Sequence, residues 1–169
     1  QGGLKRPLKI ASLSTVEREL SQTLAFGARI ITWDDPFYPP LLRHIDSAPP
    51  VLTVKGKIEL LQTPLFAIVG ARNASAMGKK MAYQFAQGLG KKGWSIASGL
   101  ARGIDAAAHK GSLASGTVGV LANGIDQIYP PENEELYAHM AQEGVLLTES
   151  PFGTQPQANL FPRRNRIIS

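Results

Sequence analysis

The sequence contains no cysteine, which excludes a disulfide framework and any zinc site built from thiolates. Its three histidines, His44, His109 and His139, are too scattered along the chain to suggest a metal cluster. No apolar run is long enough to cross a bilayer, and the first residues lack the apolar stretch of a secretory signal. From these absences we expect a cytoplasmic protein with no bound metal and no membrane partner.

The chain has a moderate proportion of charged residues, and basic residues outnumber acidic ones. Charged residues make up 18% of the 169 residues, and 18 basic residues stand against 13 acidic ones. The excess is general, because residues 1–61 hold 8 basic and 6 acidic groups while residues 62–169 hold 10 and 7. Such a balance is compatible with an anionic partner such as nucleic acid, but it does not identify one. The apolar fraction of 43% predicts a globular domain with a real core.

The first third of the chain divides into a helical part and a strand-rich part. Residues 11–26 carry apolar side chains at positions 13, 16, 20, 24 and 26, a helical spacing that ends at Gly27. We therefore assign residues 1–29 to an N-terminal helical segment, which would be the remnant of a preceding helical module. The following residues, to 56, place five prolines among short β-branched runs, which indicates strands and turns.

From residue 65 onward, strand-like apolar runs alternate with helix-length segments. The runs are residues 65–70, 94–98, 117–122 and 145–150, and the expected helices are residues 77–91, 102–114 and 132–142. Runs that are apolar throughout are buried on both faces, and this alternation requires right-handed crossovers and a mostly parallel sheet. We predict an α/β fold, a Rossmann-like doubly wound sheet over residues 30–169 with an N-terminal extension. Phe66 and Trp94 are expected in its core.

The chain ends as it enters a further helix, with no strand to follow. We therefore expect the C-terminal part of the domain to be missing, including at least one strand.

Two glycine-containing segments resemble known nucleotide-binding motifs but lie in the wrong structural context. Residues 88–93, GLGKKG, match the dinucleotide-binding pattern GxGxxG, but they close an expected helix and precede a strand. A working fingerprint follows a strand and opens a helix, so that helix amides meet the pyrophosphate. Gly78 and Lys79 resemble the end of a phosphate-binding loop, but Asn73 and Lys80 break its pattern. We expect no nucleotide cofactor.

The segments that follow the four predicted strands combine glycine with arginine and small polar residues. In an open α/β sheet, ligands bind in the crevice at the carboxyl ends of the strands. Glycine lets backbone amides approach a ligand, and the guanidinium group of arginine matches phosphate oxygens. Five arginines are thus predicted on one edge. The candidate binding residues are Gly70, Arg72, Ser98, Gly99, Arg102, Gly103, Asn123, Gly124, Arg163, Arg164, Asn165 and Arg166.

Several of these residues have a simpler explanation. Arg72 and Arg102 could each be plain surface residues, and residues 163–166 could be a solvated charge run. Asp105 and His109 are four residues apart on one helix face, which suits a hydrogen-bonded structural pair. Acid–base catalysis by that pair would need a nucleophile, a second carboxylate or a metal set that the sequence does not offer.

Two aromatic residues lie in the loops of the same edge. Phe152 and Phe161 could stack on nucleic-acid bases or pack against the protein.

Several long motifs in order resemble one family. They are AIVGAR (67–72), SGLARGIDAAAH (98–109), GVLANGIDQIYPPEN (119–133), LLTESPFGTQP (146–156) and FPRRNRIIS (161–169). Together they are similar to the DNA-processing protein A family, DprA, also called Smf. The resemblance covers roughly residues 30–169, since residues 38–56 are also similar to the segment that leads into the family's extended Rossmann domain.

The resemblance implies a bacterial cytoplasmic protein that binds single-stranded DNA without sequence preference. It implies protection of incoming DNA, loading of the RecA recombinase in natural transformation, a homodimer, and no enzyme activity. By motif match, the DNA pocket would comprise Arg72, Gly99, Arg102, Gly103, Arg164, Asn165 and Arg166. Arg163 falls on a variable position. Ala71 stands where the family often has Ser or Thr, and no lysine lies at Gln127 or Pro131, which weakens the basic lining there.

Two enzyme classes remain as alternatives. A nucleotide-processing enzyme of the phosphoribohydrolase type would use the same edge, but its PGGxGT-type loop and following glutamate are absent. An NAD-dependent dehydrogenase would need a fingerprint in context and an acidic residue for the ribose, and the sequence has neither.

Overall fold

The computed structural model describes residues 10–169. Residues 1–9, which belong to the predicted N-terminal helical segment, lie outside the described residues. The strands are β1 (Arg29–Thr32), β2 (Val51–Gly56), β3 (Leu65–Ala67), β4 (Ser95–Ser98), β5 (Thr117–Val120) and β6 (Val145–Thr148). The α-helices are α1 (Leu13–Ala25), α2 (Ala76–Gly90), α3 (Ile104–Ser112), α4 (Glu134–Glu143) and α5 (Leu160–Ile168). Short 3-10 helices occupy Leu41–His44, Ile58–Gln62 and Pro131–Asn133.

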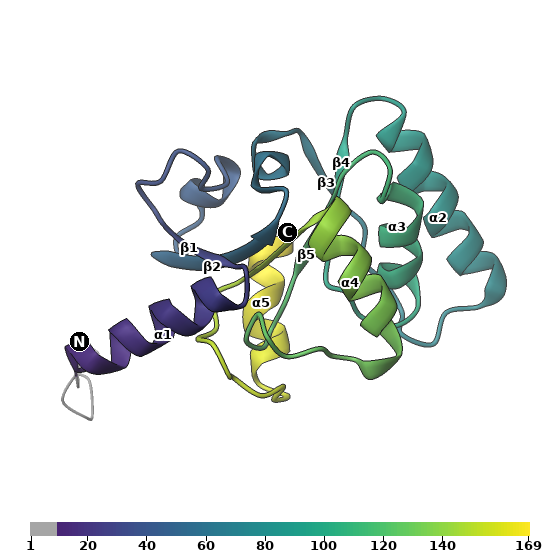
Figure 1. Ribbon diagram of the computed structural model, residues 1–169. Coiled ribbons are helices and arrows are strands. Elements are labelled where there is room, and N and C mark those ends of the chain that lie inside the picture. The colour runs from purple at the N-terminus through teal and green to yellow at the C-terminus, as the bar shows by residue number, and fades with distance from the viewer. Residues whose placement is uncertain (1–9) are drawn as a thin grey trace, which may run out of the picture.

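The six strands form one sheet in the order β1-β2-β6-β5-β4-β3. Strands β3, β4, β5 and β6 are parallel to one another, whereas β2 pairs antiparallel with β6 and β1 pairs antiparallel with β2. The predicted α/β class and the mostly parallel Rossmann-like sheet are confirmed. The strand-rich segment after residue 29 is the predicted N-terminal extension, and its two strands continue the same sheet (Figure 1).

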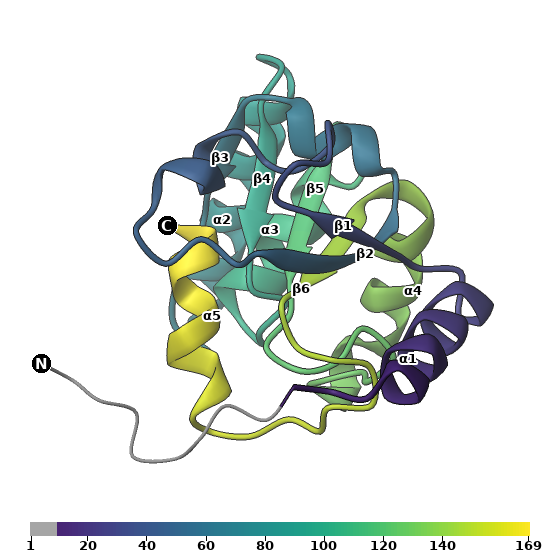
Figure 2. The ribbon, with the colours of Figure 1, turned by 90° about the vertical axis from the view of Figure 1, so that its left-hand side faces the viewer.

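Helices cover both faces of the sheet. Figure 1 shows α2, α3 and α4 on one face, and α5 lies across the opposite face, as the turned view of Figure 2 confirms. The two sides of β6 explain this layering, because side chains alternate along a strand. Val145 and Leu147 pack with Ile168 of α5, whereas Leu146 packs with Met140 of α4. The parallel strands therefore bury both faces, as their uninterrupted apolar sequences predict.

Strand β3 departs from this pattern. It forms the outer edge of the sheet among the described residues, and Phe66 and Trp94 are 47% and 39% exposed. Their rings meet edge to face, with centroids 6.2 Å apart. The expectation that both residues lie in the core is wrong, because Phe66 is in an edge strand, which has a neighbour on one side only, and Trp94 precedes β4 beside it. The apolar sequence of β3 does not reveal its position in the sheet.

The glycine motif at residues 88–93 forms a helix end, as predicted. Helix α2 ends at Gly90, the amide of Lys91 donates to the carbonyl of Gln87, and Gly93 adopts a φ of +84°. Strand β4 then begins at Ser95. Among residues 10–169, no helix is long and apolar enough to cross a membrane.

Candidate functional site

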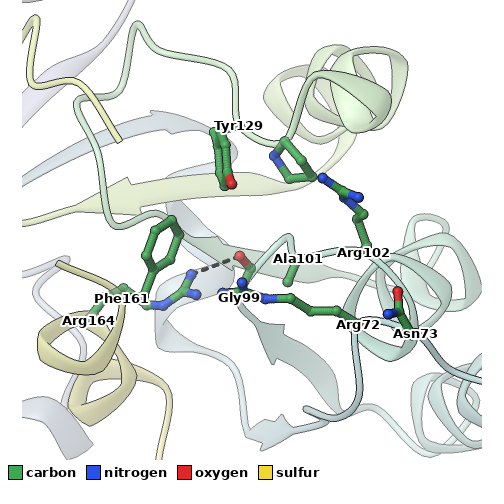
Figure 3. A pocket seen from close by; sticks show the side chains of 9 residues that line it. Arg72, Asn73, Gly99, Ala101, Arg102, Tyr129, Phe161 and Arg164 are labelled. Carbon is green, nitrogen blue, oxygen red and sulfur yellow. Dashed lines mark hydrogen bonds between the residues drawn. The ribbon is translucent and has the colours of Figure 1, made fainter. Parts of the chain in front are cut away.

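A pocket of about 210 Å³ opens at the carboxyl ends of β3, β4 and β5, where an open α/β sheet binds its ligands. Three loops and the start of α5 supply its walls (Figure 3). The lining residues are Arg72, Asn73, Gly99, Ala101, Arg102, Tyr129, Pro130, Phe161 and Arg164. None of these nine carries a carboxylate, so the pocket is suited to an anion.

Arg72 stands between the β3 exit and helix α2, and its side chain reaches across the pocket. Its guanidinium carbon lies 5.3 Å from the centroid of the Phe161 ring, within the range of a cation–π contact. Tyr129 also packs against Phe161, and the two ring centroids are 5.6 Å apart. Two rings and one cation therefore share a wall of the pocket (Figure 3).

Arg102 lies opposite, in the loop between β4 and α3. Its Nε atom is 3.4 Å from a carboxylate oxygen of Glu132, and both side chains are more than half exposed. An exposed ion pair of this kind contributes little stability, so the guanidinium group of Arg102 is free to exchange this carboxylate for another anion.

Arg164 is buried, with 5% of its surface exposed. Its Nη1 atom donates to the carbonyl oxygens of Gly99, at 2.7 Å, and of Val120. Burial lowers the pKa of the Arg164 guanidinium, and the neighbouring charge of Asp105 acts in the opposite direction. Arg164 thus joins α5 to the ends of β4 and β5 and forms the floor of the pocket.

Asp105 ties the first two strand exits together. Its two carboxylate oxygens accept the amides of Gly70, at 3.2 Å, and of Gly99, at 3.1 Å. The expected hydrogen-bonded pair of Asp105 and His109 is therefore corrected, because the carboxylate of Asp105 is engaged by backbone amides. These amides compete successfully because Asp105 is buried in the first turn of α3, directly beneath both loops.

His109 has a separate structural role. Its Nε2 atom accepts the amide of Leu100 at 3.2 Å, and its Nδ1 atom lies 2.7 Å from the hydroxyl of Thr117. Complete burial, aided by the charge of Arg164, lowers the pKa of His109 to about 3, so the ring is neutral. Leu100 adopts a φ of +55°, and its carbonyl accepts the side-chain amide of Asn133 at 2.8 Å.

Two glycines are required by close approach. Gly103 has a φ of +79°, and a Cβ atom there would lie 2.2 Å from the carbonyl oxygen of Ala71. A Cβ atom on Gly99 would lie 2.6 Å from Nη2 of Arg164. Glycine at position 103 lets the loops after β3 and β4 pack against each other, and glycine at position 99 leaves room for the guanidinium group of Arg164 from α5.

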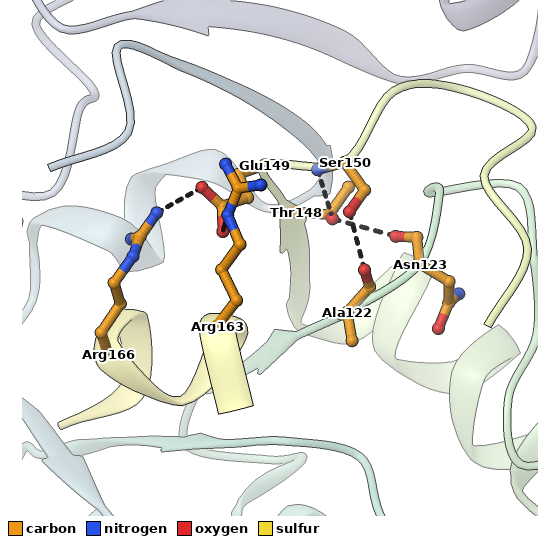
Figure 4. Close-up of polar contacts among 7 residues, drawn as sticks. All are labelled: Ala122, Asn123, Thr148, Glu149, Ser150, Arg163 and Arg166. Carbon is orange, nitrogen blue, oxygen red and sulfur yellow. Dashed lines mark hydrogen bonds and ion pairs between the residues drawn. The ribbon is translucent and has the colours of Figure 1, made fainter. Parts of the chain in front are cut away.

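Three candidate residues are turned away from the pocket. The hydroxyl of Ser98 donates to the carbonyl of Ile68 at 2.6 Å, and the side chain of Asn123 donates to the carbonyl of Gln127. The amide of Gly124 donates to the carbonyl of Thr154. All three residues are buried and hold loops together. Figure 4 shows the same network continuing through Thr148 and Ser150 to the carbonyls of Asn123 and Ala122.

Glu149 separates the five predicted arginines into two groups, because it forms ion pairs with two of them. Its carboxylate pairs with Arg163, at 3.2 Å, and with Arg166, and only 10% of its side chain is exposed (Figure 4). Arg163 does not line the pocket. Gly70, Asn165 and Arg166 line an adjoining hollow of about 520 Å³ that also contacts Arg72 and Arg164. Three arginines therefore meet in the pocket, and two are held beside it by one carboxylate.

Tyr129 and Pro130 are pocket residues that sequence reasoning missed. They follow β5 in the segment IYPPEN, so their position after a strand exit was a signal that could have identified them. Of the two loop aromatics, Phe161 lines the pocket. Phe152 packs edge to face on Phe26, with centroids 5.8 Å apart. Among residues 10–169, no group of three or more acidic or histidine side chains gathers as a metal site would require.

Comparisons with known proteins point to one family. A family model described as DNA recombination-mediator protein A matches residues 29–169. The chain is 47% identical to the DNA processing protein DprA of Bacillus subtilis over 135 residues, which is 78% of this chain and 46% of that relative. The chain spans between 37% and 54% of the length of the curated relatives it matches.

Two solved structures are similar to the chain. DNA processing protein A from Streptococcus pneumoniae superposes with a TM-score of 0.85 at 35% identity, covering 94% of this chain and 54% of that one. DNA processing protein A from Helicobacter pylori, described for its single-stranded DNA binding mode, gives a TM-score of 0.75 at 30% identity. That match covers 82% of this chain and 64% of the other.

Proposed function

Because the chain belongs to the DNA recombination-mediator protein A family, we propose that its pocket binds single-stranded DNA without reading base sequence. The observation that carries the proposal is the guanidinium group of Arg72 lying over the ring of Phe161, in a pocket that Arg102 also lines. Cations that contact phosphates, together with rings on which bases stack, are the elements of sequence-tolerant strand binding.

The lining of the pocket supports binding through the backbone of the strand. Asn73 is the one side-chain amide among its nine residues, whereas base-edge recognition relies on several amide and arginine contacts. We assign direct phosphate contact to Arg72 and Arg102. Gly99 and Arg164 form the floor, and Gly70, Gly103, Asn165 and Arg166 shape the adjoining surface.

Arg72→Gln and Arg102→Gln are each expected to weaken binding of labelled oligo-dT about tenfold, since each removes one charge-assisted contact. The slope of log affinity against log salt should fall by about 0.7 per variant, the value for one phosphate contact on a single strand. Fluorescence anisotropy over a salt series measures both quantities.

Lys92→Gln is the matched control, because Lys92 is exposed and precedes β4. It therefore lies at the amino ends of the parallel strands, whereas the pocket lies at their carboxyl ends. It changes the net charge equally and should leave affinity and slope near those of the unmodified chain. Affinities of the two arginine variants equal to that of Lys92→Gln would refute the assignment.

Phe161→Leu is expected to weaken oligo-dT binding about tenfold while leaving the salt slope unchanged, because stacking is lost but no charge is. Phe152→Leu provides the comparison, since its ring packs on Phe26 and should affect stability alone. A reduced salt slope in Phe161→Leu would show that the ring acts only by holding Arg72.

The alternative, a nucleotide-processing enzyme of the phosphoribohydrolase type, is tested by incubation with AMP and related monophosphates. The absence of a carboxylate among the nine lining residues favours a binding protein over a hydrolase. Release of free base would establish the enzyme instead, and a gel shift with oligo-dT without turnover supports the binder.

We also propose the finer role that membership of this family suggests. In it, the protein protects incoming single-stranded DNA in the bacterial cytoplasm and loads the RecA recombinase during transformation, acting as a homodimer. Shielding of oligo-dT from a single-strand nuclease, stimulation of RecA filament formation and the mass in solution test the three parts separately.

A further inference from the structure

A third and larger hollow, of about 790 Å³, lies beyond Arg72 and Arg102, along helices α2 and α3. We call it the α2–α3 groove. Its lining residues are Arg72, Asn73, Ala74, Lys79, Lys80, Tyr83, Arg102, Gly103, Ala106, Ala107, Lys110, Glu132 and Asn133. Arg72, Asn73 and Arg102 line the pocket as well, so pocket and groove meet at these side chains.

Small residues between the two helices create the groove. A Cβ atom on Gly111 of α3 would lie 2.4 Å from the carbonyl oxygen of Tyr83, which shows how closely α2 and α3 approach each other. Ala106 and Ala107 of α3 line the groove with short side chains, which take up little of its space. The floor is therefore small and apolar, while the rim is long and cationic.

The charge of the groove is strongly positive. Five cations line it against one carboxylate, that of Glu132, which is paired with Arg102. None of the ion pairs among residues 10–169 involves Lys79, Lys80 or Lys110, and all three lysines are exposed. Lys79 stands in the first turn of α2, which has no acidic residue, although a helix start favours negative charge. An external anion would offset that unfavourable placement.

Tyr83 adds an aromatic surface to the same side of α2. It follows Lys80 by three residues and Lys79 by four, so the three side chains share one helix face. Tyr83 is 41% exposed. The groove thus repeats the combination found in the pocket, cations beside an exposed ring.

We propose that a strand bound in the pocket continues into the α2–α3 groove, where Lys79, Lys80 and Lys110 contact its phosphates and Tyr83 stacks on a base. This inference rests on the proposed function and extends its site. The half of α2 from Ala76 to Tyr83 is about 10 Å long, which matches the rise of about three stacked nucleotides. The groove therefore lengthens the binding site by about that number.

The test compares two oligonucleotides, dT of about 4 and of about 12 nucleotides, which lie within the lower range of single-strand site sizes. The variant Lys79→Gln/Lys80→Gln is matched by Lys91→Gln/Lys92→Gln, because both pairs are exposed lysines at opposite ends of α2. The expected result for Lys79→Gln/Lys80→Gln is a loss of about tenfold in affinity for the long strand. Its salt slope should fall by about 1.4.

For the short strand, Lys79→Gln/Lys80→Gln should bind as the unmodified chain does, and Lys91→Gln/Lys92→Gln should leave both strands unaffected. Lys110→Gln and Tyr83→Leu should likewise weaken the long strand alone. Equal losses for both strands, or no loss for either, overturn the inference while leaving the pocket intact. Failure of the unmodified chain to bind either strand overturns the proposed function itself.

Discussion

Arg164→Met is expected to lower the free energy of unfolding by about 3–5 kcal/mol, the range for breaking a buried charged contact. The substitution keeps an unbranched side chain but leaves the carbonyl oxygens of Gly99 and Val120 without their donor. Each buried polar group left unsatisfied costs about 1–3 kcal/mol. The buried carboxylate of Asp105 also loses its neighbouring cation.

Arg163→Met is the matched control for this prediction. Arg163 is the adjacent residue on α5, its side chain is 65% exposed, and its ion pair with Glu149 leaves Arg166 in place as a partner. Its loss should change the unfolding free energy by less than about 1 kcal/mol. Chemical denaturation of both variants decides the matter, and coincident midpoints would show that Arg164 does not support the fold.

Acid is expected to destabilise the protein through His109, with a loss of about 3 kcal/mol in unfolding free energy between pH 7 and pH 4. The unfolded chain protonates this ring near its ordinary pKa of 6.5, whereas the folded chain does so only at about 3. Between these values the unfolded state binds more protons, so stability falls as pH falls. The slope approaches about 1.4 kcal/mol per pH unit.

His109→Gln isolates this contribution, since glutamine offers an acceptor for the amide of Leu100 but does not titrate. The variant should be less stable at neutral pH, yet its stability should decline much less between pH 6.5 and pH 4. His44→Gln and His139→Gln serve as controls, because both rings are exposed and should leave the acid dependence intact. An acid dependence in His109→Gln as steep as theirs would assign the effect to carboxylates.

Sequence patterns predicted well those parts of the fold that depend on local helix or strand preference and on repeating apolar patterns. Alternating apolar runs and helical segments specify the parallel sheet, and the carboxyl ends of its strands bring Arg72 and Arg102 to one edge. The direction of each side chain was harder to predict. Arg164 and Ile168 are four residues apart and both buried, so helical phase could have indicated that Arg164 faces inward while Arg163 faces outward.

Other features depend on individual side-chain contacts. Asn123 turns inward because the carbonyl of Gln127 accepts its amide, and Glu149 captures Arg163 and Arg166 from the far side of a loop. Neither contact is marked by a repeating pattern in the sequence, so pattern analysis could not predict it. The exposure of Phe66 likewise follows from the place of β3 in the sheet, which an apolar run alone does not specify.

The bonds that hold Gly99 and Leu100 determine how the pocket meets its ligand. Asp105 and Arg164 hold both polar groups of the Gly99 backbone, and His109 and Asn133 hold those of Leu100 in its left-handed conformation. A left-handed conformation is strained in a residue other than glycine, and it persists only where surrounding contacts hold it in place. The floor is therefore preorganised, so the ordering entropy of association falls mainly on the flexible DNA strand and on the exposed side chains of Arg72 and Arg102.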